Sequence, residues 1–144
     1  MDKEYYSYNQ LIDDMKILAN MLRPYDFQMI IPITRGGLVP ACHLGYLLNI
    51  KYYQALCLSN YNAKEETEMT VICVPEIDER IPREKVLVVD GMVDKGTTLA
   101  KVRELLGPDV KIASIHIKPH TKYLPDFYLH RTEKWVEYPW EYGR

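Results

Sequence analysis

The chain has 144 residues, of which 47% are hydrophobic and 26% charged, and its formal net charge is −2. This composition is typical of one globular domain with a sizeable core, and it excludes the basic field that would recruit nucleic acid or an anionic membrane. No apolar run approaches the roughly 20 residues of a membrane helix, and the polar start MDKEYYSYNQ is unlike a signal peptide. We therefore expect a cytoplasmic protein with no nucleic-acid or membrane partner.

The first half of the chain predicts a helix, a strand and a second helix. Apolar side chains recur at helical spacing within residues 7–22, and Ser7 with Gln10 matches a capping box. An apolar run of strand length follows at residues 28–33, and Pro40 fits the first turn of a helix that runs to about Asn49. The three cysteines lack CxxC spacing and are expected to be buried, reduced thiols: Cys42, Cys57 and Cys73.

The second half of the chain continues the alternation of strands and helices. Further strands are expected at residues 52–58, 70–74, 85–89 and 111–117. A helix is expected from Thr97 to Leu106, stopped by Gly107 and Pro108. Strands buried on both faces that alternate with helices indicate an α/β fold with a mostly parallel sheet. The tail from Lys118 onward is rich in proline and aromatic residues, and we expect it to form a small appendage.

The stretch VLVVDGMVDKGTTLA, residues 86–100, has the character of a binding site. Its apolar run would deliver Asp90 and Asp94 to the carboxyl edge of the sheet, where ligands bind in open parallel sheets. The following turn would place backbone N–H groups and two hydroxyls at a helix N-terminus, which suits phosphate. Carboxylates suit sugar hydroxyls or Mg²⁺. An ordinary strand–turn–helix with solvated acids fits the same residues, whereas Walker and dinucleotide-binding glycine patterns are absent from the sequence.

This stretch resembles the phosphoribosyl pyrophosphate (PRPP) motif of type I phosphoribosyltransferases, and the resemblance extends over nearly the whole chain. Residues 30–50 are similar to the family's pyrophosphate loop, residues 56–72 to its mobile loop, and residues 117–141 to the base-binding hood of the xanthine–guanine and hypoxanthine branch. The resemblance implies the type I phosphoribosyltransferase fold, a mostly parallel twisted sheet flanked by helices. Residues 1–144 would form one domain, with a core of about 1–117 and a hood of about 118–144.

The resemblance also implies a reaction and its site residues. A 6-oxopurine base and PRPP would give a nucleoside 5′-monophosphate and pyrophosphate, with Mg²⁺ held at Asp90. Asp94 would be the catalytic acid–base group near the purine N7. The residues implied to bind PRPP are Asp90, Asp94, Lys95, Gly96, Thr97 and Thr98. The pyrophosphate loop would be Thr34, Arg35, Gly36 and Gly37, a loop that often contains a cis peptide in this family. The mobile loop would contribute Ser59 and Tyr61, and the base would meet Lys118, Trp135 and the backbone of Val136.

The sequence departs from the family pattern at two positions, and two competing functions fit it. Gly91 stands where the family has a second acid, and Lys95 stands where it has a threonine. Restoring the acid with Gly91→Asp is therefore expected to strengthen PRPP binding in Mg²⁺. Gly91 also leaves room for a catalytically weak or inactive PRPP or nucleotide sensor on the same fold, and a binding module for another phosphorylated ligand is a further alternative. The family implies a homo-oligomer, a dimer or tetramer.

Overall fold

The computed structural model describes residues 2–60 and 69–143, and its centre is a six-stranded sheet. The strands are β2 (Met29–Thr34), β3 (Leu56–Asn60), β4 (Met69–Cys73), β5 (Val86–Val93), β6 (Lys111–Ile117) and β7 (Phe127–Arg131). They lie in the order β4-β3-β2-β5-β6-β7, and every neighbouring pair is parallel except β3 and β4. The predicted fold class, a mostly parallel sheet flanked by helices, is confirmed.

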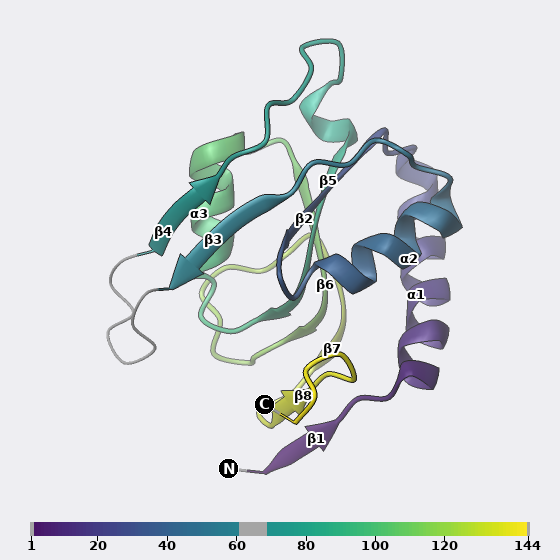
Figure 1. Ribbon diagram of the computed structural model, residues 1–144, viewed down its shortest axis with the longest axis vertical. Coiled ribbons are helices and arrows are strands. Elements are labelled where there is room, and N and C mark those ends of the chain that lie inside the picture. The colour runs from purple at the N-terminus through teal and green to yellow at the C-terminus, as the bar shows by residue number, and fades with distance from the viewer. Residues whose placement is uncertain (1, 61–68, 144) are drawn as a thin grey trace.

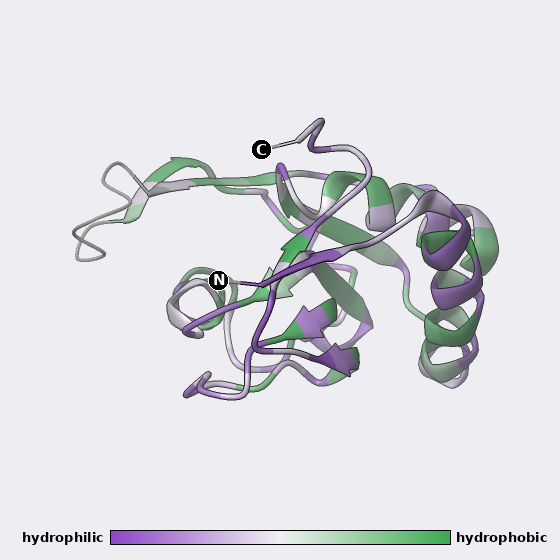
Figure 2. Ribbon diagram, turned by 90° about the horizontal axis from the view of Figure 1, so that it is seen from below, coloured by the Kyte–Doolittle hydropathy of each residue, from purple (hydrophilic) through white to green (hydrophobic). Residues whose placement is uncertain are grey.

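Helices cover both faces of this sheet (Figure 1). α1 (Tyr8–Leu22) and α2 (Leu38–Leu48) pack on one face, and α3 (Thr97–Leu106) packs on the other. Successive side chains of a strand point to opposite faces, so Leu87 and Val89 join the α1/α2 core whereas Val86 and Val88 join the α3 core. This arrangement explains why β2, β5 and β6 are mostly apolar, whereas α1 carries both hydrophobic and hydrophilic residues (Figure 2).

The local signals in the sequence locate the helices well. The predicted capping box is present, with Ser7 Oγ accepting from Gln10 N at 3.1 Å and Gln10 Oε1 accepting from Ser7 N at 2.8 Å. α2 ends at Asn49, which adopts a left-handed conformation. Two short 3₁₀ turns, Arg23–Tyr25 and Arg83–Lys85, precede β2 and β5. None of the helices in the described ranges is long and apolar enough to cross a membrane.

Several strand boundaries differ from the prediction. The strand expected at residues 52–58 starts only at Leu56, and before it Tyr53 makes an isolated bridge to Ile30. β5 was expected to end at residue 89 but continues to Val93, because Asp90, Met92 and Val93 go on pairing with β6. Asp90 therefore lies inside a strand rather than at its end.

The tail beyond Lys118 contributes to the main sheet as well as to a separate small one. β7 adds a parallel edge strand next to β6, so the sheet extends beyond the core expected at about 1–117. β8 (Trp135–Glu137) instead pairs in parallel with β1 (Lys3–Tyr5), and these two strands lie side by side below the main sheet (Figure 1). The hood therefore includes residues from the beginning of the chain.

The cysteines are free, as predicted, but the expectation that all three are buried is wrong. Cys42 and Cys73 are exposed and Cys57 is partly buried. Cys73 lies on β4, an edge strand of the sheet, where most side chains lack a covering layer. Cys42 lies on the outward side of α2.

Candidate active site

The strand order places the site at the centre of the sheet. From β2 the chain proceeds through α2 to β3 on one side, and from β5 it proceeds through α3 to β6 on the other. β2 and β5 are neighbours, so the loops that follow them leave the sheet in opposite directions. Such a switch point opens a crevice at the carboxyl ends of the strands, where open α/β sheets bind ligands.

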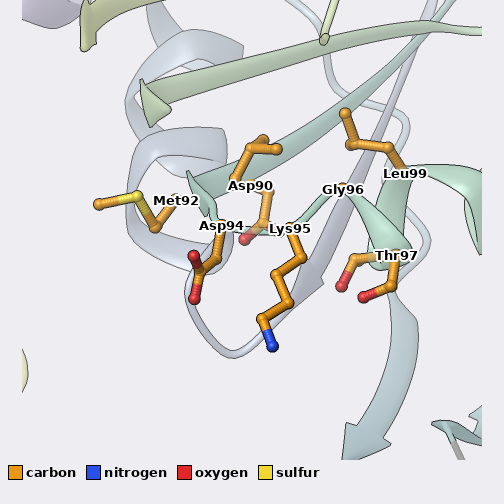
Figure 3. A pocket seen from close by; sticks show the side chains of 9 residues that line it. Asp90, Met92, Asp94, Lys95, Gly96, Thr97 and Leu99 are labelled. Atoms are coloured by element: carbon orange, nitrogen blue, oxygen red, sulfur yellow. The ribbon is translucent and has the colours of Figure 1, made fainter. Parts of the chain in front are cut away.

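The turn after β5 surrounds a cavity of about 240 Å³ (Figure 3). All six residues that the sequence predicts to bind PRPP line it: Asp90, Asp94, Lys95, Gly96, Thr97 and Thr98. Gly96 has φ +90, and a Cβ there would lie 2.8 Å from Thr121 Oγ1, so glycine is required at this position. Gly96 caps α3 without a side-chain hydrogen bond to the first turn. The first N–H groups of the helix are thus available to an anion.

Asp90 contributes a partly buried carboxylate to this cavity. Its Oδ1 accepts a hydrogen bond of 2.8 Å from Gly91 N, but burial outweighs that bond and raises the pKa of Asp90 to about 6. A carboxylate in this position gains from a cation or a hydroxyl donor, since either would offset its lost hydration. Hard oxygen donors of this kind suit Mg²⁺. In the described part of the chain no group of three His, Cys, Asp or Glu side chains could hold a metal, so a magnesium ion here would need ligands from a substrate and water.

The predicted pyrophosphate loop contacts the same strand. Its Thr34–Arg35 peptide bond is cis, the feature that the family resemblance implies. A Cβ on Gly37 would lie 2.1 Å from Val89 O, and one on Gly36 would lie 3.4 Å from Asp90 Oδ1. The two glycines therefore let this loop pack directly on β5, beside Asp90. Arg35 is exposed at the tip of the loop, outside the residues that line the cavity.

Gly91 faces away from the cavity that Asp90 lines. Its Cβ would point toward Gly36 O at 3.2 Å and Tyr138 Cζ at 3.7 Å, and its φ is outside the left-handed region. The hydroxyl of Tyr138 donates to Gly91 O at 2.9 Å and lies 2.9 Å from His116 Nδ1. Burial raises the pKa of Tyr138 and lowers the pKa of His116 to about 4, so both groups are neutral and Nδ1 is the donor.

A second cavity of about 420 Å³ adjoins the first, and both are lined by Met92, Asp94 and Lys95. All three residues predicted to contact the base line it: Lys118, Trp135 and Val136. Trp135 is half exposed. Lys118 is 8% exposed, and its Nζ donates to the backbone carbonyls of Glu133 and Lys134. The remaining residues of this cavity are His120, Glu133, Tyr138 and Glu141.

Sequence reasoning missed two residues of the site. Nε2 of His120 lies 2.8 Å from Oδ1 of Asp94, and Tyr138 links the hood to β5. His120 had one available signal, since it stands three positions after the end of β6, the strand that neighbours β5. Tyr138 had none, because its partners are far away in the sequence. Of the predicted mobile-loop residues, Ser59 lies in β3 opposite Thr70, and Tyr61 lies outside the described residues.

Comparison with known proteins is consistent with this geometry. The family model described as phosphoribosyl transferase domain matches residues 4–144. The chain is 33% identical over 139 residues to a xanthine-guanine phosphoribosyltransferase of Chromohalobacter salexigens, covering 95% of this chain and 83% of that protein. A crystal structure of a purine phosphoribosyltransferase from Pyrococcus horikoshii superposes with a TM-score of 0.82 at 36% identity, covering 98% and 95% of the two chains. A Neisseria gonorrhoeae protein with bound ppGpp has a TM-score of 0.72 at 28% identity, covering 97% and 89%.

Proposed function

The chain belongs to the phosphoribosyl transferase domain family, and from this premise we propose that it is a purine salvage enzyme that joins a 6-oxopurine to PRPP. The observation that carries the proposal is the pair of adjoining cavities with Asp94 and Lys95 between them. One cavity is polar and lies at a helix N-terminus, which suits a sugar phosphate. The other offers an indole and a buried ammonium group, which suits a purine with an oxo substituent.

On the PRPP side, the chain's own residues bind and orient the sugar. The N–H groups of the first turn of α3, with the hydroxyls of Thr97 and Thr98, would hold the 5′-phosphate. Asp90 would accept from the ribose hydroxyls. Arg35 and the glycine backbone that follows would hold the pyrophosphate leaving group. Bond breaking at the anomeric carbon would leave an oxocarbenium-like sugar. The protein would therefore lower the barrier by positioning the reactants and stabilising charge, and not by nucleophilic attack.

On the base side, three residues would select and align the purine. Trp135 would stack on its rings, and the backbone of Val136 would contact its edge. Two of the three N–H groups of the Lys118 ammonium donate to backbone carbonyls, and the third would donate to the 6-oxo oxygen. A 6-amino group would set a donor against that donor, so adenine should be rejected.

Asp94 stands between the two cavities, where the base and the anomeric carbon would meet. Its carboxylate would accept or relay the proton from the purine N7 as the base attacks. Mg²⁺, with Asp90 as its ligand from this chain, would supply positive charge that neutralises the phosphate oxygens of PRPP.

One assay tests the enzyme proposal. The protein is incubated with PRPP, Mg²⁺ and hypoxanthine, guanine, xanthine or adenine, and the nucleotide product is measured. We expect nucleotide from at least one oxopurine and little from adenine, with no product when PRPP is omitted. Failure of all three oxopurines in a folded sample would refute the proposal.

A nucleotide sensor is the second candidate function. Gly91 removes an acid from the family's PRPP motif, and the structural relative from Neisseria gonorrhoeae holds the guanine nucleotide ppGpp. The same two cavities would then bind a guanosine phosphate, and the protein would not catalyse the transfer reaction. Calorimetric titration with GMP and ppGpp, combined with the product assay, distinguishes the candidates, because a sensor binds these nucleotides but forms no nucleotide from PRPP and base, whereas the enzyme forms it.

We further propose that the protein is cytoplasmic and forms a homo-oligomer. α2 exposes the apolar side chains of Leu38 and Tyr46, the second of which is 87% exposed. Covering such side chains favours association of two copies. Light scattering at micromolar protein concentration tests the oligomer, and a monomer mass would refute it.

A further inference from the structure

Asp94 and His120 meet at the mouth of the base cavity. Nε2 of His120 lies 2.8 Å from Oδ1 of Asp94, and the two side chains are 59% and 61% exposed. Both residues line the cavity that contains Trp135. The contact is therefore part of the site where the purine would bind, rather than a remote surface pair.

The sheet brings these two residues together. Asp94 directly follows β5, and His120 lies three positions beyond β6, whose last residue Ile117 pairs with Val93. The two turns are also joined by backbone hydrogen bonds, from Lys118 N to Val93 O at 2.8 Å and from Lys122 N to Lys95 O at 3.2 Å. The relative position of Asp94 and His120 is thus set by backbone pairing rather than by the two side chains alone.

An exposed carboxylate on a turn samples several rotamers, and only some of them point an oxygen at the base. An ionised carboxylate only accepts hydrogen bonds, so the hydrogen of this contact is on Nε2 of His120. The bond occupies Oδ1 and leaves Oδ2 for the purine. It therefore restricts Asp94 to one orientation before the substrate arrives.

We propose that His120 is a positioning residue that holds the Asp94 carboxylate in the orientation needed for proton transfer with the purine. The inference rests on the proposed function, since it assigns Asp94 its role in that reaction. His120 acts through Asp94, so its loss should slow the chemical step and leave PRPP binding unchanged. Loss of orientation at a reacting group lowers rates by up to about 10²-fold, and we expect about tenfold here, since the rest of the turn stays in place.

Three variants separate the hydrogen bond from the bulk of the side chain. His120→Phe keeps a ring without a donor, and His120→Gln places an amide donor at similar reach. The single-turnover rate constant of nucleotide formation should fall about tenfold in His120→Phe and less than threefold in His120→Gln, with the PRPP dissociation constant within twofold of wild type. His130→Phe is the matched control, because it removes a histidine bonded to a carboxylate, Asp14, outside both cavities. Its rate should stay within twofold.

A double-mutant cycle tests whether His120 acts through Asp94. In an Asp94→Asn background, His120→Phe should change the rate less than twofold. Equal losses in the phenylalanine and glutamine variants, a loss below twofold in His120→Phe, or full additivity with Asp94→Asn would overturn the inference.

Failure of the proposed function would be seen separately, as a wild-type protein that makes no nucleotide. In that case the contact itself is tested by ¹⁵N spectra of the imidazole rings. The Nε2–H signal of His120 should move when Asp94 is replaced by alanine. An unchanged signal would overturn the inference without reference to activity.

Discussion

The hydroxyl group of Tyr138 is the buried link between the hood and β5, and its removal should destabilise the protein strongly. Tyr138→Phe keeps the ring, which stacks on Trp140 at a centroid distance of 4.8 Å. It removes one oxygen, which donates to Gly91 O and accepts from His116 Nδ1, both at 2.9 Å. The variant therefore loses two hydrogen bonds without opening a cavity.

The size of the effect follows from these two bonds. A hydrogen bond contributes about 0.5–1.5 kcal/mol net, and a buried group left without a partner costs about 1–3 kcal/mol. His116 is only 1% exposed, and in the variant its Nδ1–H would be left without this hydrogen-bond partner. We expect a loss of about 2–4 kcal/mol in the free energy of unfolding, which corresponds to a Tm lower by roughly 5–12 °C for a chain of this length.

Urea denaturation at neutral pH measures this loss, with calorimetry for the Tm. Tyr128→Phe is the control, because its hydroxyl accepts a long, exposed hydrogen bond of 3.4 Å from Arg131. The control should lose less than about 0.5 kcal/mol, as surface substitutions do. If Tyr138→Phe lost no more than the control at an unchanged m-value, the reasoning about this link would be refuted.

Further predictions concern the two cavities and the buried histidine. Trp135→Ala should weaken nucleotide binding by about 1–3 kcal/mol, by analogy with base–aromatic stacking, with PRPP binding nearly intact; calorimetry showing equal nucleotide affinity in a folded variant would remove the stacking role. Gly91→Asp should not tighten PRPP binding, contrary to the expectation from the family pattern, because a side chain there points toward Gly36 O and Tyr138 rather than into the cavity that Asp90 lines, and its crowding should cost about 1–3 kcal/mol of stability; tighter PRPP binding than wild type in Mg²⁺ would contradict this. Burial lowers the pKa of His116 to about 4, so the unfolded chain takes up the proton first and stability should fall as the pH drops from about 6.5 to about 4. Asp90 also titrates in this range, so the urea midpoints of wild type and His116→Gln are measured at each pH and subtracted. The difference should shrink as the pH falls, and a difference that does not change with pH would contradict the prediction.

Much of the fold was predictable because its signals are local. The bounds of α3 and β6 were predicted to the residue, since Gly107 and Pro108 stop the helix and an apolar run marks the strand. The end of β5 was not, because backbone pairing with β6 continues at Asp90, Met92 and Val93 regardless of their side chains. The role of β7 was missed for a related reason: an edge strand with one open face lacks the continuous apolar run of a buried one.

The site was predictable in its composition but not in its connections. The residues predicted to contact PRPP and the base gather in two adjoining cavities because neighbouring parallel strands end at the same edge of the sheet. The direction in which Gly91 faces and the bond between His120 and Asp94 depend on packing between distant segments. No periodicity or motif in the sequence encodes such contacts.

The pairing of β1 with β8 has a consequence for the order in which the site is assembled during synthesis. Trp135 N donates to Asp2 O and Tyr6 N donates to Glu137 O, so each strand of this small sheet depends on the other. On the ribosome the N-terminal strand emerges first and must wait, unpaired, until nearly all of the chain has been translated. The strands and helix that form the cavity after β5 are complete earlier. A nascent chain therefore completes the turn from Asp94 to Thr98 before the segment that carries Trp135.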